Sequence, residues 1–320
     1  MPGCAIRLTQ PVQIWGAGDT GDAGDAVGAG DAVGASDAGD GSDTKGGEST
    51  KYKNIPRMPP EDYPRVDGST ANIPLAVALM EAVTGCSHER AEALVYFSNT
   101  DDSYSVILLP DSGYYGANLL LAYEASDATK AIEGYDSLSF VPIGRDALVF
   151  LVNGQNPVMS LSTGQLRDVF SGAATNWKSL GGADLQVKAY QRQELSGSQT
   201  LMKKLVMGGV EMFDPGIEPI YTMSGLIDAV GSFDASPGAI GYSVYYYAHN
   251  MYDMPGVRIL SVDGVAPSFE TIRSGEYPHV NDFFCVLPQN PAPSAELIAK
   301  WLASDEGQDF IKDNGYVPVR

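Results

Sequence analysis

The chain has 320 residues, 44% of them apolar and 9% aromatic, so it can form two compact domains. Lys and Arg number 20 against 40 Asp and Glu, a formal charge of −20 at pH 7, which argues against nucleic acid as a partner because that binding relies on basic side chains. The charge also disfavours a basic membrane-surface module. The run 147–152, with six apolar residues, is among the longest, far below the roughly 20 residues of a membrane span.

Residues 1–62 are predicted to be a flexible, acidic, Gly/Ala/Asp-rich linker. Between residues 16 and 47 the chain is mostly Gly, Ala, Asp and Ser, and the unit Gly-Asp-Ala-Val-Gly-Ala occurs twice in tandem. This composition cannot bury enough apolar surface to offset the entropy lost on ordering. The first 50 residues hold eight acidic and two basic side chains, so −14 of the net charge belongs to the rest.

Cys4 follows Gly3 and precedes this linker. A small residue before a cysteine, ahead of a long polar linker, is typical of surface lipoproteins after signal cleavage. The apolar segment that should come before the cysteine is missing from the sequence. Two interpretations therefore stay open, lipid attachment at Cys4 with a truncated start, or an incidental cysteine.

The folded part is predicted to begin near Tyr63 and to alternate short strands with helices. The predicted strands are 105–109, 118–123 and 140–152, and the predicted helices are 73–80, 163–170, 199–207, 225–230, 294–303 and 305–314. This alternation indicates an α/β fold with largely parallel sheets. About 255 ordered residues suit two lobes with a ligand in the crevice at the carboxyl ends of the strands.

Metal and disulfide chemistry have little support. Three cysteines are too few for a disulfide framework, so two free thiols are expected at Cys86 and Cys285, although a bridge between them is arithmetically possible. The histidines show no ligand spacing and neighbour no cysteine, so neither a metal nor a cofactor is predicted. They are His88, His249 and His279.

Two segments have the composition of an anion site. Gly68-Ser69-Thr70 comes before a predicted helix and offers hydroxyls, backbone N–H groups and a helix N-terminus, although taken alone the segment favours a routine helix cap. Arg192 comes four residues before Ser196-Gly197-Ser198, which opens another helix. Glycine permits close backbone approach, the serines add hydroxyl donors, and the guanidinium is a planar bidentate donor for tetrahedral oxyanions.

Glu124 and Asp127 follow the predicted strand 118–123, where crevice residues belong. Their alternative interpretation is a solvated loop.

From Tyr63 to Arg320 the sequence resembles the substrate-binding proteins of phosphate ABC transporters, in the Gram-positive style. The resemblance covers about four-fifths of the chain and depends on several motifs in the family's order. They are Asp67-Gly68-Ser69-Thr70, Pro142-Ile143-Gly144-Arg145-Asp146-Ala147, Asn153-Gly154-Gln155-Asn156-Pro157-Val158, Gln165-Leu166-Arg167-Asp168-Val169-Phe170-Ser171-Gly172, Thr175-Asn176-Trp177, Tyr190-Gln191-Arg192, Ser196-Gly197-Ser198-Gln199-Thr200, Ala239-Ile240-Gly241-Tyr242-Ser243, Tyr277-Pro278, Glu306-Gly307-Gln308 and Gly315-Tyr316-Val317-Pro318.

The resemblance implies a type II periplasmic-binding-protein fold whose two lobes close over inorganic phosphate. The first lobe would comprise 63–149 and 251–320, the second 150–250, with a hinge near 147–152. It further implies delivery to ABC transporter permease subunits, an extracytoplasmic location, either anchored or secreted, and a monomer without catalytic activity or nucleic-acid partner. The residues implied for phosphate binding are Ser69, Thr70, Ala71, Thr100, Glu124, Arg192, Ser196, Gly197 and Ser198.

Within this implied site, Glu194 would orient the Arg192 guanidinium. Glu124, with Asp127 as the alternative, would accept the proton of hydrogen phosphate. A buried carboxylate repels fully deprotonated sulfate but accepts a hydrogen bond from protonated phosphate, so it would also set specificity. Thr100 would supply a second hydroxyl of the first lobe, although the sequence departs here from the Gly-rich turn of enterobacterial members.

Three alternatives remain open from the sequence. One is a binding protein for another oxyanion, such as sulfate or molybdate. Another is a phosphate sensor that delivers nothing to a transporter. The third is a serine-dependent phosphatase or other hydrolase with Ser196 or Ser198 as nucleophile, but the Gly-x-Ser-x-Gly elbow of such enzymes is absent from the sequence.

Overall fold

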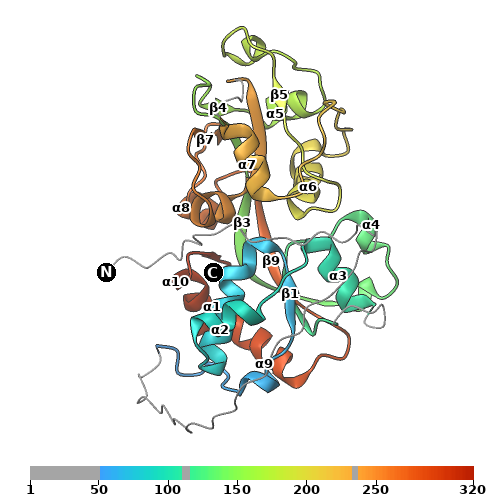
Figure 1. The fold of residues 1–320 in the computed structure, drawn as a ribbon, viewed down its shortest axis with the longest axis vertical. Coiled ribbons are helices and arrows are strands. Elements are labelled where there is room, and N and C mark those ends of the chain that lie inside the picture. The colour runs from blue at the N-terminus through green and yellow to red at the C-terminus, as the bar shows by residue number, and fades with distance from the viewer. Residues whose placement is uncertain (1–50, 110–115, 233–236) are drawn as a thin grey trace, which may run out of the picture. The chain divides into compact units, whose positions relative to one another are not determined.

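The computed structural model describes residues 51–109, 116–232 and 237–320 (Figure 1). Within the described residues, Asn54–Arg320 form one compact unit. Cys4 and most of the predicted linker lie outside the described residues. The fold below is that of Asn54–Arg320.

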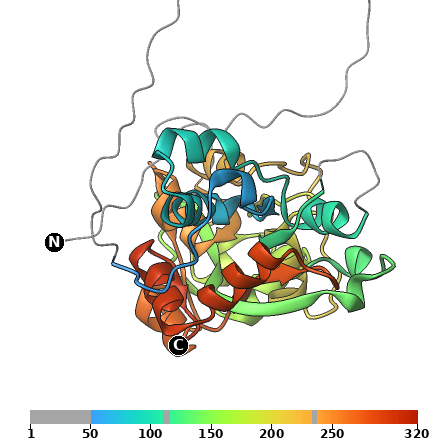
Figure 2. The same cartoon turned by 90° about the horizontal axis from the view of Figure 1, so that it is seen from below.

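One group of strands, here the first strand group, consists of β1, β2, β9, β10 and the first half of β3. β1 runs parallel to β2, β2 and β3 both pair with β9 antiparallel, and β10 pairs with β3. The bounds are β1 Val66–Gly68, β2 Leu119–Ala122, β3 Ser139–Asn153, β9 Val280–Leu287 and β10 Val317–Pro318. The helices around it are α1 Ile73–Thr84, α2 His88–Leu94, α3 Thr100–Leu108, α4 Asp127–Lys130, α9 Pro293–Leu302 and α10 Asp305–Asp313. In Figure 2, α1 and α2 (blue to teal) lie side by side, and α9 and α10 (red) lie on another side of the first strand group.

The second strand group consists of the second half of β3 with β5, β6 and β7, and with the small β4–β8 pair. The bounds are β4 Ser160–Leu161, β5 Lys188–Ala189, β6 Ala239–Val244, β7 Val257–Ile259 and β8 Ser261–Val262. The helices are α5 Thr163–Phe170, α6 Gly197–Leu201, α7 Met223–Gly231 and α8 Phe269–Ser274, and α6 continues as a π-helix, Met202–Met207. Figure 1 shows these helices around one strand group and α1–α4 with α9 around the other.

Short helical turns complete the described chain. They are the 3₁₀ turns Pro60–Asp62, Thr70–Asn72, Tyr135–Ser137 and Trp177–Leu180, and the π-helical turn Tyr247–Met251.

Strand β3 connects the two groups. Its residues up to Ala147 pair with β9, and from Leu148 onward they pair with β6. The run from Ala147 to Val152 is completely buried, as expected for a strand covered on both faces. Asp146 lies where the pairing changes, and it accepts hydrogen bonds from the Tyr123 hydroxyl (2.6 Å) and the Tyr246 N–H (3.1 Å).

The structure confirms most predicted elements within a few residues, including the long central strand and the helices at 163–170, 294–303 and 305–314. The strand predicted at 105–109 is wrong, because these residues fall in α3 and the residue after it. Asn99 caps this helix by accepting from the Asp102 N–H (3.0 Å), and Tyr104 and Ile107 bury one helical face. Cys86 and Cys285 are free thiols, as predicted.

The prediction of largely parallel sheets is also wrong. Five of the eight strand pairs in the described residues are antiparallel. The reason is that β9 lies antiparallel between β2 and β3, and that β6 and β7 return antiparallel to β3. The expected return to the first lobe at residue 251 differs from the pairing too. β7 and β8 follow residue 251 yet pair with β3 and β4 of the second group.

Candidate anion-binding site

Arg192 is a buried cation with unused donors. It lies between β5 and α6, with 7% of its surface exposed. Nη2 donates to the Tyr221 carbonyl at 2.8 Å, while Nε and Nη1 are buried without a hydrogen-bond partner among the described residues. Burial lowers the pKa of Arg192 to about 10, so the side chain remains charged at neutral pH. An anion would satisfy both its charge and its two donors.

The start of α6 presents further donors of the same kind. Ser196 is the N-cap and accepts from the Gln199 N–H at 3.3 Å. Ser198, in the first turn, is 4% exposed, and its hydroxyl has no partner within the described residues. Free N–H groups at a helix start add to the attraction for an anion.

Tyr242 of β6 connects these two features. Its hydroxyl accepts from the Arg192 backbone N–H at 3.1 Å and donates to the Gln199 side-chain oxygen. The same side chain therefore fixes the Arg192 segment and the first turn of α6. Tyr242 belongs to one of the family motifs in the sequence, but its position in a strand gave no signal of this hydrogen-bonding role.

The first strand group contributes Ser69, Thr70 and Ala71, which follow β1. Ser69 is buried and its N–H donates to the Leu121 carbonyl at 3.0 Å. Thr70 opens the 3₁₀ turn, and the Ala71 carbonyl accepts from the Tyr316 hydroxyl at 2.7 Å. These contacts fix the turn after β1 between β2 and the C-terminal strand region.

Asp67 ties this turn to the segment before α3. Its carboxylate accepts from the Gly68 N–H (2.6 Å), the Ser98 N–H (2.8 Å) and the Ser98 hydroxyl (2.8 Å). Burial raises the pKa of Asp67, although these hydrogen bonds oppose the shift. Thr100, the residue after Asn99, is thereby held near the turn by a short chain of hydrogen bonds.

Thr100 and Gly197 bring the two strand groups together. A Cβ atom placed on Gly197 would lie 2.5 Å from the Thr100 Oγ1 atom, so the α6 backbone lies directly against this side chain. The start of α3 thus meets the start of α6. Of the predicted residues, the structure places Thr100 in contact with the Ser196–Ser198 segment.

Glu124 has both carboxylate oxygens in ion pairs. Oε1 lies 2.5 Å from Lys130 Nζ, and Oε2 pairs with Lys204 of the π-helix. Burial alone would raise the pKa of Glu124, but the two lysines outweigh it and lower the pKa below its ordinary value. This differs from the expected proton acceptor with a free oxygen. Asp127, the alternative, is fully exposed and lies 3.6 Å from Lys130.

A third carboxylate, Asp101, was not singled out from the sequence. It is 2% exposed and follows Thr100 in α3. Oδ1 accepts from the Ser126 N–H at 2.9 Å, while Oδ2 is buried and has no partner in the described part of the chain. Neither the motifs nor the charge pattern distinguish it from Asp102 beside it.

The expected pairing of Glu194 with Arg192 is not the arrangement found. Glu194 is exposed and pairs with Lys203. The reason is geometric, because Glu194 lies on the solvent side of the segment while Arg192 turns inward against Tyr221.

The contacts of His279 are with residues other than Ser196 and Ser198. The buried His279 contacts the Thr163 hydroxyl at 3.2 Å, and burial lowers its pKa to about 4. Across the described residues, no group of His, Cys, Asp and Glu side chains could hold a metal ion. No helix in that part of the chain is long and apolar enough to cross a membrane.

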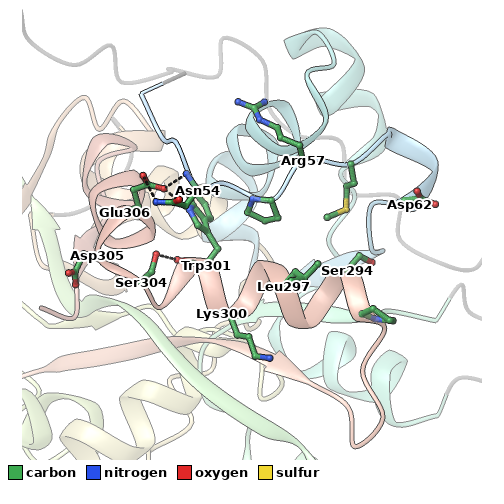
Figure 3. Close-up of a pocket in the computed structure, with 13 residues that line it drawn as sticks. Asn54, Arg57, Asp62, Ser294, Leu297, Lys300, Trp301, Ser304, Asp305 and Glu306 are labelled. Atoms are coloured by element: carbon green, nitrogen blue, oxygen red, sulfur yellow. Dashed lines mark hydrogen bonds between the residues drawn. The ribbon is translucent and has the colours of Figure 1, made fainter. Parts of the chain in front are cut away.

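A surface pocket of about 1030 Å³ lies elsewhere (Figure 3). Its lining comes from residues 54–62, from α9 and from residues 304–306, and includes Pro56, Leu297 and Trp301. None of the candidate anion-binding residues lines it.

Comparison with known proteins supports the family that the sequence motifs resemble. The phosphate-binding protein PstS of Borreliella burgdorferi is 25% identical over 181 residues, 55% of this chain and 64% of that protein. The PstS of Bacillus subtilis is 29% identical over 191 residues, 58% of this chain and 60% of that protein. The chain therefore matches less than two thirds of the length of either relative.

Solved structures agree on the fold. A putative phosphate ABC transporter substrate-binding protein from Clostridium perfringens, solved with bound phosphate, superposes with a TM-score of 0.63 at 21% identity, covering 81% of this chain and 100% of that one. An ABC-type phosphate transport receptor from Vibrio cholerae gives 0.57 at 20% identity, covering 79% and 98%. The family model described as PBP superfamily domain matches residues 117–306, more than half of the sequence. The chain belongs to the PBP superfamily, which confirms the predicted periplasmic-binding-protein fold.

Proposed function

We propose that this chain binds inorganic phosphate and delivers it to the permease of an ABC transporter. The observation that carries the proposal is Arg192, a buried guanidinium whose Nε and Nη1 atoms have no partner among the described residues. Leaving charged donors unpaired in a protein interior is costly, so such a group is expected where an anion completes it. The relatives named for phosphate binding support phosphate as the anion.

Each strand group with its helices forms one lobe in this proposal, and phosphate binds between them. The donors are the hydroxyls and backbone N–H groups at the turn after β1, at the start of α3 and at the start of α6, together with the guanidinium. These residues are Ser69, Thr70, Ala71, Thr100, Arg192, Ser196, Gly197 and Ser198. Lobe closure then removes water from the anion, which strengthens every contact to it.

The carboxylate that accepts the phosphate proton is Asp101 in this proposal, in place of Glu124. Asp101 Oδ2 is buried and unpartnered in the described chain, whereas both oxygens of Glu124 are paired with lysines. A carboxylate with a free, desolvated oxygen discriminates best, because a fully deprotonated anion leaves it without a donor.

Titration calorimetry on the full chain tests the proposal. After exhaustive dialysis, phosphate is expected to bind at one site per chain, with sulfate a weak competitor. Arg192→Lys should weaken phosphate strongly, because lysine cannot replace a planar pair of donors. Binding of sulfate in preference to phosphate would instead favour the oxyanion alternative, and absence of any anion binding would refute both. Turnover of a chromogenic phosphate ester would point to a hydrolase, which the proposed function excludes.

The rest of the proposal concerns the cellular setting. The protein acts outside the cytoplasm as a monomer, and Cys4 is the candidate for lipid attachment. Mass spectrometry of the chain isolated from its native membrane fraction is expected to show a lipid on Cys4. An unmodified Cys4 would leave an unanchored binding protein.

A further inference from the structure

Glu124 joins the two strand groups through an ion pair. It follows β2 of the first strand group, while its partner Lys204 belongs to the π-helix that continues α6 in the second strand group. The two residues are 80 positions apart in the sequence. Lys130, on the same side as Glu124, holds the other carboxylate oxygen at 2.5 Å.

Both ends of this ion pair are tied to elements of the candidate site. The Glu124 loop includes Ser126, whose N–H donates to Asp101 in the first turn of α3. Lys204 lies on the helical continuation of α6, whose start carries Ser196 and Ser198. The bridge therefore spans the same boundary at which α3 and α6 meet.

The surroundings favour an ionised carboxylate. Glu124 is only 26% exposed, and Lys130 and Lys204 offer two positive charges against it. Asp127 competes weakly for Lys130 at 3.6 Å, and Lys203 is already paired with Glu194. The ion pair between Lys204 and Glu124 therefore forms only when the two strand groups are close together.

We propose that Lys130, Glu124 and Lys204 form a clasp that stabilises the closed arrangement of the two strand groups without contacting the ligand. Lys130 orients the carboxylate from its own side, and Lys204 closes the bridge from the other. Glu124 and Lys204 are thus positioning residues. Opening must break the Glu124–Lys204 pair, so the clasp slows ligand release. This proposal rests on the proposed function.

A double-mutant cycle on the full chain tests the clasp. Phosphate affinity is measured by calorimetry for the wild type, Glu124→Gln, Lys204→Gln and the double variant. Each single variant is expected to weaken phosphate roughly two- to fivefold at low salt, a range set by the partial exposure of the lysine. The double variant should be no weaker than either single one, because both remove the same bond. The phosphate-to-sulfate ratio should stay unchanged throughout.

Salt and a matched control sharpen the result. At high salt the differences between wild type and variants should shrink, since salt screens the pair. Glu296→Gln removes an ion pair with Lys300 at 2.8 Å that lies within α9 alone, so it should leave phosphate affinity unchanged. An unaltered affinity in Lys204→Gln would refute the clasp. So would a changed phosphate-to-sulfate ratio in Glu124→Gln alone, because that outcome makes Glu124 a ligand contact.

Failure of the clasp and failure of phosphate binding remain distinguishable. If the wild type binds no phosphate, the proposed function fails, and the same cycle is then read from thermal unfolding of the free chain. A coupling between Glu124 and Lys204 in that measurement supports the clasp, and strict additivity overturns it.

Discussion

The Thr100 side chain lies directly against the backbone of Gly197, so the starts of α3 and α6 touch across the two strand groups. Only a residue without a side chain fits at this contact, because a Cβ would lie 2.5 Å from Oγ1 and 3.2 Å from Cβ of Thr100. The glycine that we propose as part of the anion site therefore also permits close approach of the two strand groups.

Gly197→Ala is expected to weaken phosphate binding roughly tenfold, because closing over the added methyl costs about 1–3 kcal/mol. Gly164→Ala is the matched control. Gly164 lies in the first turn of α5, and a Cβ there meets only the Ser162 hydroxyl at 3.7 Å. Calorimetry should show the loss in Gly197→Ala alone. Equal phosphate affinities in the two variants would mean that Gly197 does not belong to the phosphate site.

Arg192→Met should raise the melting temperature of the free protein while weakening phosphate at least about 100-fold. The substitution removes a buried charge with two unpaired donors, and with it several charge-assisted hydrogen bonds to the anion. Thermal unfolding without phosphate, together with calorimetry, measures both effects.

Arg258→Met provides the opposite control. Arg258 donates through Nη1 and Nη2 to the carbonyls of Gly154, Asn156 and Val158, and only its Nε lacks a partner among the described residues. Its loss should therefore reduce the free energy of unfolding by about 1–3 kcal/mol, and with it the melting temperature. Phosphate binding should stay intact. A fall in stability for both arginine variants would contradict an unsatisfied guanidinium at position 192.

Asp101→Asn is expected to reduce the preference for phosphate over sulfate at least roughly tenfold, because an amide no longer excludes a fully deprotonated anion. Asn retains an oxygen that can accept from the Ser126 N–H, so the loop should stay in place. Asp102→Asn changes the same charge on an exposed neighbour and should leave the preference unchanged. A shift in Glu124→Gln instead would restore Glu124 as the discriminating carboxylate.

Asp146 should make stability depend on pH between about 4 and 6. Burial raises its pKa from 3.8 to about 6 in the folded chain, although hydrogen bonds from Tyr123 and backbone N–H groups oppose the shift. Its stabilising contribution is therefore present below the unfolded pKa and is lost as pH rises through about 6.

Asp146→Asn removes this titration while keeping a group that can bond Tyr123. The difference in melting temperature between wild type and variant should change in that pH range and stay flat above pH 7. Parallel curves from pH 4 to 8 would mean that Asp146 does not titrate as proposed.

Local signals in the sequence predicted the elements well where they were long or capped. The apolar run 147–152 and the helices near the C-terminus needed no tertiary information. The run 105–109 misled because a short apolar segment suits a strand or a buried helix equally. The Asn99 cap with Asp101 and Asp102 in the first turn was the signal for a helix.

Features that depend on pairing across the chain could not be predicted from local patterns. Strand direction depends on β9, which returns from the far end of the sequence to lie between β2 and β3. Family motifs predicted Arg192 and Ser198 as site residues. Only the folded structure shows that their donors lack hydrogen-bond partners among the described residues. The Glu124–Lys204 pair joins positions that no periodicity relates.

The continuous strand β3 has a consequence for the order in which the chain folds during synthesis. The strands of the second group that pair with one another all lie between residues 148 and 262. The first group needs β1, β9 and β10, and therefore residues 66 to 318. Chains emerge from the ribosome N-terminus first. The second strand group can therefore assemble before all strands of the first group have been synthesised. β9 then pairs with residues 139–147 of β3, the part of the strand that leads directly into the already assembled second group.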